Sequence, residues 1–203
     1  ALEDPMASIQ EALAKKTGLN PNDYQSLIIV QRAIDARGKT PTFRFTVDIE
    51  LDEARGQKII ATNKAHPPKQ IGHYRWTLQT PPDGPRPVVI GAGPGGLFAA
   101  LTLAEAGWAP IVLERGNPVE TRAKDVSGLY SKGILNEDSN VCYGEGGAGT
   151  FSDGKLYTRV SDARVLQFME SLVRFGANPD ILINNRPHLG TDKLIALLKE
   201  VRA

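Results

Sequence analysis

One continuous stretch, residues 88–116, constrains the fold more than any other part of the chain; it reads VVIGAGPGGLFAALTLAEAGWAPIVLERG. Branched apolar residues at its start predict a short strand, and the glycines and proline that follow predict a turn. Residues 95–107 predict a helix, and residues 110–114 predict a second strand that ends in an acid, Glu114. This order is that of a β-turn-α-β unit, which binds the diphosphate of a dinucleotide when its turn has GxGxxG spacing.

The residues of the turn have that spacing, and each residue type has a physical reason. Gly91 allows the tight turn that leaves the strand, Gly93 allows backbone to approach a diphosphate, and Gly96 allows the helix to pack closely. The helix N-terminus offers N–H groups and a partial positive charge. Glu114 follows Gly91 by 23 residues, and its carboxylate can accept hydrogen bonds from ribose hydroxyls while disfavouring the 2′-phosphate of NADP. The expected binding residues here are Gly91, Gly93, Pro94, Gly95, Gly96 and Glu114. The alternative is a glycine-rich turn without a ligand.

Residues 87–104 carry no charge and approach the length of a membrane-spanning helix. Four glycines and an internal proline in the first ten of these residues break such a helix, so we reject a membrane segment. The first thirty residues lack the apolar core of a signal peptide. The single cysteine, Cys142, cannot form a disulfide or a CxxC pair within the chain, which fits a reducing compartment such as the cytoplasm.

The organisation along the chain predicts two parts. Residues 81–87 are rich in proline and glycine and predict a linker between a small α+β module, 1–80, and an incomplete α/β domain, 88–203. In the module we expect a short helix that ends at Gly18 and strands at 26–30, 42–51 and 73–79. Its basic and aromatic residues raise the alternative of nucleic-acid binding, but a net charge of +1 argues against it.

After the dinucleotide motif, the pattern continues as α/β. Residues 164–176 and 191–202 predict amphipathic helices, and residues 180–185 between them predict a strand. The helical pattern runs to the end of the sequence without a cap, and Ala1 is not an initiator residue. We therefore expect the chain to be a fragment of a longer protein.

Several motifs carry a resemblance to known proteins. Residues 87–116 resemble the FAD-binding N-terminus of glutathione-reductase-type flavoproteins, which implies a Rossmann-like fold and FAD. Three separated motifs, RAIDARGKTPTFRFTVDIEL, GEGGAGTFSDGKL and PHLGTDKL, resemble in order a bacterial family of FAD-dependent dehydrogenases whose members are longer. The C-terminal Gly-Asp segment that usually closes the flavin site in such proteins is not found after residue 160, which also implies a fragment.

The resemblance gives a role to the second glycine-rich stretch, EGGAGTFSDGKL at 145–156. In the related flavoproteins such a loop lies against the FAD diphosphate or flavin, where backbone N–H groups bind anions. The residues that this implies are Gly146, Gly147, Ala148 and Gly149, with Thr150 or Ser152 as hydroxyl donors and Arg115 and Arg122 near the adenine, ribose or phosphates. A flexible surface turn is the alternative.

These observations predict an FAD-dependent oxidoreductase that acts on a small-molecule substrate or an electron donor such as NAD(P)H. Two alternatives stay open: a flavin-binding regulatory or structural protein, and an NAD-dependent dehydrogenase, which would leave the second glycine loop without a reason. No catalytic residue is assigned. His188 is a candidate acid or base but is more often structural at such a position, and no metal-binding constellation is evident in the sequence. The substrate and the oligomeric state cannot be read from the sequence.

Overall fold

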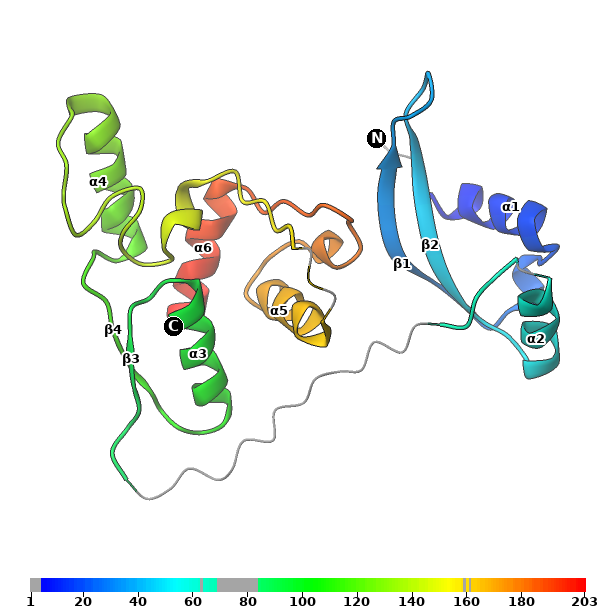
Figure 1. Cartoon of the computed structure of the whole chain (residues 1–203), viewed down its shortest axis with the longest axis horizontal. Coiled ribbons are helices and arrows are strands. Elements are labelled where there is room, and N and C mark those ends of the chain that lie inside the picture. Colours follow the sequence, from blue (N-terminus) through cyan, green and yellow to red (C-terminus); the bar gives the residue numbers. More distant parts are fainter. Residues whose placement is uncertain (1–4, 63, 69–83, 159, 161) are drawn as a thin grey trace. The chain divides into compact units, whose positions relative to one another are not determined.

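The computed structural model describes residues 5–62, 64–68, 84–158, 160 and 162–203 (Figure 1). The chain divides into two compact units, residues 1–72 with 182–185 and residues 73–181 with 186–203. The predicted strand at 73–79 and most of the predicted linker lie outside the described residues. The predicted boundary near residue 80, between the small α+β module and the linker, stays a prediction.

The first unit is built on an antiparallel pair of strands, β1 (Ser26–Asp35) and β2 (Thr42–Glu50). Phe45, Val47 and Ile49 of β2 are half-buried in alternation, so the predicted half-buried strand is confirmed from residue 45 on, whereas Phe43 is exposed. Helix α1 (Met6–Thr17) ends at Gly18, which has a φ of 82° and donates its N–H to the carbonyl of Ala14. This C-terminal glycine confirms the predicted helix end.

Helix α2 (Glu53–Ala61) was not predicted, although its start has a clear signal. The Asp52 side chain accepts a hydrogen bond from the N–H of Arg55, as an N-cap residue does. The buried apolar side chains of the described part of this unit are Ile9 of α1, Leu19 and Ile59 of α2. The unit therefore has the α+β content expected from the sequence.

The second unit begins with a parallel βαβ unit. Strand β3 (Val88–Ile90) pairs in parallel with β4 (Ile111–Leu113), and helix α3 (Pro94–Glu105) connects them and contacts both (Figure 1). The predicted strand-turn-helix-strand order is thereby confirmed, with element ends that differ by at most two residues. The two-stranded sheets of the described residues, together with the helices, establish a mixed α/β architecture.

The remaining elements of this unit are helical. They are α4 (Val119–Lys132), the short 3₁₀ helix η2 (Ala148–Phe151), α5 (Ala163–Arg174), η3 (Pro179–Leu182), whose last residue groups with the first unit, and α6 (Thr191–Arg202). Helices α5 and α6 were predicted. Helix α6 contacts both α4 and η2, and the buried side chains of Leu197 and Leu198 on α6 belong to this core.

The predicted strand at 180–185 is wrong. Residues 179–182 form η3, in which the Asn178 side chain accepts a hydrogen bond from the N–H of Asp180. Pro179 presets its own φ for a turn, and this local bonding competes with an extended conformation. One isolated parallel bridge remains, between Asn184 and Arg32 of β1.

Candidate functional site

The glycine-rich turn after β3 has the geometry that its residue types predict. Gly91 has a φ of 94°, which L side chains rarely adopt, and its N–H donates to the carbonyl of Leu113 at 2.7 Å. A Cβ on Gly96 would lie 1.9 Å from the carbonyl oxygen of Gly91. Helix α3 therefore approaches the turn closely only because residue 96 has no side chain.

The N-terminus of α3 is shaped to receive an anion. Gly93 is its N-cap residue and Pro94 opens the first turn, which contains no acidic residue and no side-chain cap. A Cβ built on Gly93 or on Gly95 would meet no atom within 4 Å. No acidic side chain of the first turn offsets the helix dipole, and the Cβ positions of Gly93 and Gly95 face open space.

Glu114 is held at the end of β4 by two backbone groups. Its Oε2 accepts a hydrogen bond from the N–H of Ala92 at 2.6 Å, and its Oε1 accepts one from the N–H of Gly116 at 2.8 Å. An ionised carboxylate can accept about four hydrogen bonds, so two sites remain for ribose hydroxyls. The glycine turn itself fixes the carboxylate that the sequence singled out.

The structure brings the second glycine loop onto the first. The N–H of Gly146 donates to the carbonyl of Ala92 at 2.7 Å, and a Cβ on Gly147 would lie 3.0 Å from Cδ of Pro94. Both loop glycines have positive φ, 86° and 70°. Ala148 and Gly149 begin η2, and a Cβ on Gly149 would meet nothing within 4 Å. The two stretches thus form one continuous backbone surface.

Two further motifs singled out in the sequence also meet. The N–H of Leu156 donates to the carbonyl of Pro187, and the N–H of Leu189 donates to the carbonyl of Gly154, each at 2.9 Å. These bonds join GTFSDGKL to PHLGTDKL around a bridge between Lys155 and His188. His188 is exposed in this arrangement. Its bridge is a backbone contact, which gives the imidazole no assigned role.

The hydroxyl groups of the loop make internal contacts. Thr150 is buried, and its Oγ1 lies within hydrogen-bonding distance of Arg122 Nη1, at 3.4 Å. The Ser152 hydroxyl donates to the carbonyl of Gly149 at 2.7 Å. Cys142 is exposed, and its N–H donates to Oδ1 of Asn140. The expected role of Thr150 and Ser152 as donors to a ligand stays a prediction.

The two arginines differ from one another. Arg115 is largely exposed, forms an ion pair with Asp138 at 2.9 Å and lies over the ring of Tyr143. Arg122 is fully buried, and its three guanidinium nitrogens donate to protein groups rather than facing the open side of the turn. The expected contact between Arg122 and adenine, ribose or phosphate is therefore corrected: in this structure the side chain supports the second glycine loop.

Glu145, which is 5% exposed, was not predicted as a site residue. Its Oε2 accepts hydrogen bonds from the N–H of Val119 at 2.6 Å and from Arg202 Nη1 at 2.7 Å. The carboxylate thus joins the first turn of α4 and the last turn of α6 to the second glycine loop. An acid immediately before two glycines was the available signal, but only the fold shows which helices it reaches.

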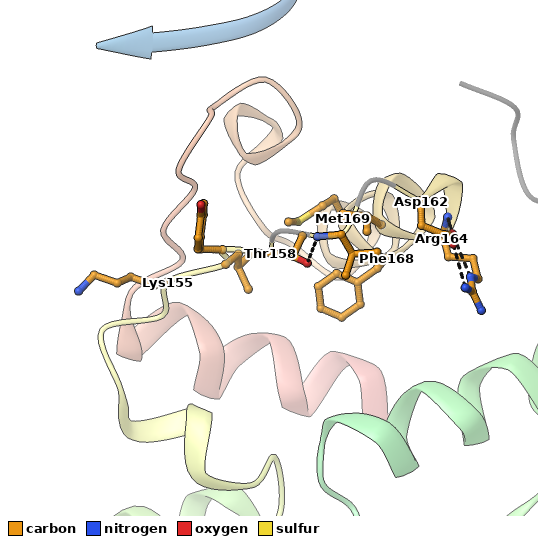
Figure 2. Close-up of a pocket in the computed structure, with 10 residues that line it drawn as sticks. Lys155, Thr158, Asp162, Arg164, Phe168 and Met169 are labelled. Carbon is orange, nitrogen blue, oxygen red and sulfur yellow. Dashed lines mark hydrogen bonds and ion pairs between the residues drawn. The ribbon is translucent and has the colours of Figure 1, made fainter. Parts of the chain in front are cut away.

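A separate open pocket of about 490 Å³ is lined by residues 155–158, Val160 and Asp162 and by one face of α5. Figure 2 shows Phe168 and Met169 of α5 in its wall beside Thr158, with the Asp162–Arg164 ion pair at one end. The Phe168 ring also contacts Phe98 of α3, with ring centroids 4.5 Å apart. This apolar contact places the pocket wall against the helix that follows the first glycine turn.

The described part of the chain contains no helix long and apolar enough to cross a bilayer. In the same residues, no three His, Cys, Asp or Glu side chains gather closely enough to hold a metal ion.

Comparisons with known proteins address this site directly. Residues 86–131 match the model of a family described as an FAD binding domain, and residues 1–50 match a domain of unknown function, DUF8436. The whole chain is 36% identical, over 209 aligned residues, to an uncharacterised protein of the bacterium Clostridium beijerinckii. The chain spans 38% of the length of that relative.

The match to the FAD binding domain identifies FAD as the cofactor of this chain. It covers the first glycine turn, α3, Glu114 and most of α4, so it coincides with the βαβ unit described above. The resemblance to FAD-dependent proteins is confirmed at this coarser level. The open space beside Gly93 and the fixed carboxylate of Glu114 fit an adenine dinucleotide.

Proposed function

We propose that this chain is the FAD-binding part of an FAD-dependent oxidoreductase with a Rossmann-like fold of the glutathione-reductase type. The observation that carries the proposal is the docking of the second glycine loop onto the turn that opens α3, through the bond from Gly146 to Ala92. In the docked loop, a Cβ on Gly149 would meet no described atom within 4 Å, so packing within the protein does not account for this glycine. The match to an FAD binding domain supports the same reading.

The proposed roles follow from the positions of the backbone groups. The N-terminus of α3, from Gly93 to Gly96, receives the diphosphate, because its first turn contains no acidic residue and the Cβ positions of Gly93 and Gly95 face open space. Glu114 accepts the ribose hydroxyls with the lone pairs that Ala92 and Gly116 leave available. Gly147, Ala148 and Gly149 form the wall on the second side.

When bound, FAD supplies hydride and electron transfer. The residues described here bind and orient the cofactor, and none of them is assigned as an acid, base or nucleophile. The proposed partners are a small-molecule substrate or an electron donor such as NAD(P)H, and the proposed compartment is the cytoplasm, in keeping with the single cysteine. We also propose that residues 1–80 form a separate module joined to the FAD-binding domain by 81–87.

Anaerobic mixing of the FAD-loaded, full-length protein with NADH, NADPH or a panel of small-molecule donors tests the oxidoreductase activity. We expect at least one donor to bleach the flavin absorbance and an added acceptor to restore it over many turnovers. A protein that holds FAD but shows no turnover with any donor or acceptor would instead favour a regulatory or structural flavoprotein. That outcome would overturn the activity while leaving the cofactor assignment intact.

A further inference from the structure

Arg122 lies in the first turn of α4, with none of its surface exposed. Its Nε donates to the carbonyl of Asn140 at 2.9 Å, and its Nη2 donates to that of Val141 at 3.0 Å. Its Nη1 donates to the carbonyl of Glu145 at 2.6 Å and, at longer range, to that of Gly144. One side chain thus donates hydrogen bonds to four backbone carbonyls in the segment that leads into the second glycine loop.

This guanidinium is a buried positive charge bonded to neutral groups. Among the described residues, its hydrogen-bond partners are the four carbonyls and the Thr150 hydroxyl, and no carboxylate is bonded to it. Its face lies over the Phe151 ring, 4.9 Å from the centroid. Removing such a group leaves several buried carbonyls unsatisfied, which is costly in a low-dielectric environment.

The shortest of these bonds continues into the proposed FAD site. The carbonyl of Glu145 accepts from Arg122, and the N–H of the same peptide group, that of Gly146, donates to Ala92 at 2.7 Å. The carbonyl and N–H of a trans peptide point in opposite directions, so this one peptide bridges α4 and the first glycine turn. Hydrogen bonds arranged in such a chain polarise one another.

The surrounding residues are adapted to the arginine. A Cβ on Gly144 would lie 2.7 Å from Cδ of Arg122, so residue 144 must be small for the side chain to pass. In the opposite direction, the Glu145 carboxylate of the loop accepts a hydrogen bond from the N–H of Val119, three residues before Arg122 on α4. Helix α4 and the loop are therefore joined in both directions, by a buried cation and by a buried acid.

We propose that Arg122 is a positioning residue that sets FAD affinity without touching the cofactor, by holding the second glycine loop against the turn that opens α3. This inference rests on the proposed FAD site. Its physical basis is preorganisation: if the loop is ordered only part of the time, the observed dissociation constant rises by the inverse of the ordered fraction. An ordered fraction of one tenth raises it about tenfold.

Arg122→Met in the full-length protein removes every donor while keeping an unbranched side chain that extends as far as the position of Nε. Arg122→Lys restores a cation with fewer donors. Lys124→Met is the matched control, because Lys124 is an exposed residue of the same helix and loses the same charge. Each variant is compared with the wild type in FAD titrations and in hydrogen exchange of the FAD-free protein, read on peptides that cover 144–150 and, separately, α3.

We expect Arg122→Met to weaken FAD binding by about tenfold or more and to lose exchange protection at 144–150 while α3 stays protected. Arg122→Lys should recover part of the affinity, and Lys124→Met should match the wild type. At saturating FAD, Arg122→Met should show the wild-type flavin spectrum, because the side chain does not contact the flavin.

Two results would overturn the proposal. Wild-type FAD affinity in Arg122→Met would show that the loop does not need its buried donor. A loss of protection spread equally over α3 and 144–150 would show a general loss of stability instead of local positioning. Failure of the wild type itself to bind FAD is a different outcome, because it would refute the proposed function and not only the role of Arg122.

Discussion

Two alanine substitutions in the first glycine turn should have opposite consequences. At Gly96, a Cβ would lie 1.9 Å from the carbonyl oxygen of Gly91, and both atoms belong to backbone that cannot move without separating α3 from the turn. Overpacking of this kind costs typically 1–3 kcal/mol. We take about 2 kcal/mol for Gly96→Ala, which corresponds to a fall of roughly 4–8 °C in the unfolding midpoint of a chain of this size.

At Gly93 the same substitution meets no atom within 4 Å, and its φ of −72° suits any L residue. The cost of replacing glycine by alanine at an N-cap offsets the gain from a less flexible unfolded chain, since each is about 0.5–1 kcal/mol. The FAD-free protein should therefore keep its stability. The new methyl group occupies the space that we assign to the diphosphate, so FAD affinity should fall by roughly tenfold to a hundredfold.

The assay combines thermal unfolding of the FAD-free protein with titration of FAD, followed by flavin fluorescence. Gly128→Ala on α4 is the control, since its Cβ would also meet nothing within 4 Å and helix propensity alone should stabilise the protein by about 0.5–1 kcal/mol. Equal FAD affinity of Gly93→Ala and Gly128→Ala would refute the placement of the diphosphate beside Gly93. Unfolding of Gly96→Ala at the wild-type temperature would refute the close packing of α3 on the turn.

Three further predictions use the same two measurements. Glu114→Gln replaces one acceptor oxygen by a donor and should weaken FAD binding about tenfold, because a bond to a charged partner contributes about 1.5 kcal/mol or more; unchanged affinity would exclude a ribose contact. Arg202 donates a hydrogen bond to Glu120 and lowers the pKa of that carboxyl from 4.5 to about 2. The pKa of Glu120 is thus lower in the folded protein than in the unfolded chain, so the ion pair contributes fully to stability above pH 4.5 and its contribution is lost as the pH falls toward 2. Glu120→Gln should therefore flatten the pH dependence of the unfolding midpoint between these two pH values. An unchanged profile would count against the ion pair. Gly146→Ala should lower the unfolding midpoint, because its φ is 86° and its Cβ would lie 2.4 Å from Leu198 Cδ1, and a midpoint equal to that of the wild type would contradict this packing.

Elements with a strong local signal were predictable from the sequence. The βαβ unit combines apolar strand residues, a glycine turn and a following helix, and these signals agree at every level. The C-terminal helices α5 and α6 show clear amphipathic patterns, and β2 alternates strictly. In each case the pattern is local, so no knowledge of distant contacts was needed.

Helix α4 was missed because its buried face includes an arginine. Val119 and Val126 are buried on α4, and Arg122 between them is buried as well. From the sequence alone, a charged residue is expected to be exposed to solvent, so Arg122 interrupts the apolar pattern that would predict the helix. Its carbonyl partners are 18 to 23 residues away in the chain. Burial of this kind depends on tertiary contacts, which hydrophobic periodicity does not report.

The glycines of the second loop were explained only in part. The sequence predicts that the cluster at 145–156 binds the cofactor, but Gly146 lies against Thr150 and Leu198, and Gly144, just before the loop, makes room for Arg122. Gly154 packs against Gly190 at the start of α6. Several glycines therefore serve the packing of the protein itself, and Gly149, whose Cβ would face open space, is better placed to serve a ligand.

The absorption spectrum of the purified full-length protein, recorded before and after acid release of its cofactor, tests the central claim most directly. We predict the two visible bands of an oxidised flavin and release of FAD in an amount close to one per chain. A colourless protein that also takes up no added FAD, while still showing a cooperative unfolding transition, would contradict the assignment of the two glycine loops to an FAD site.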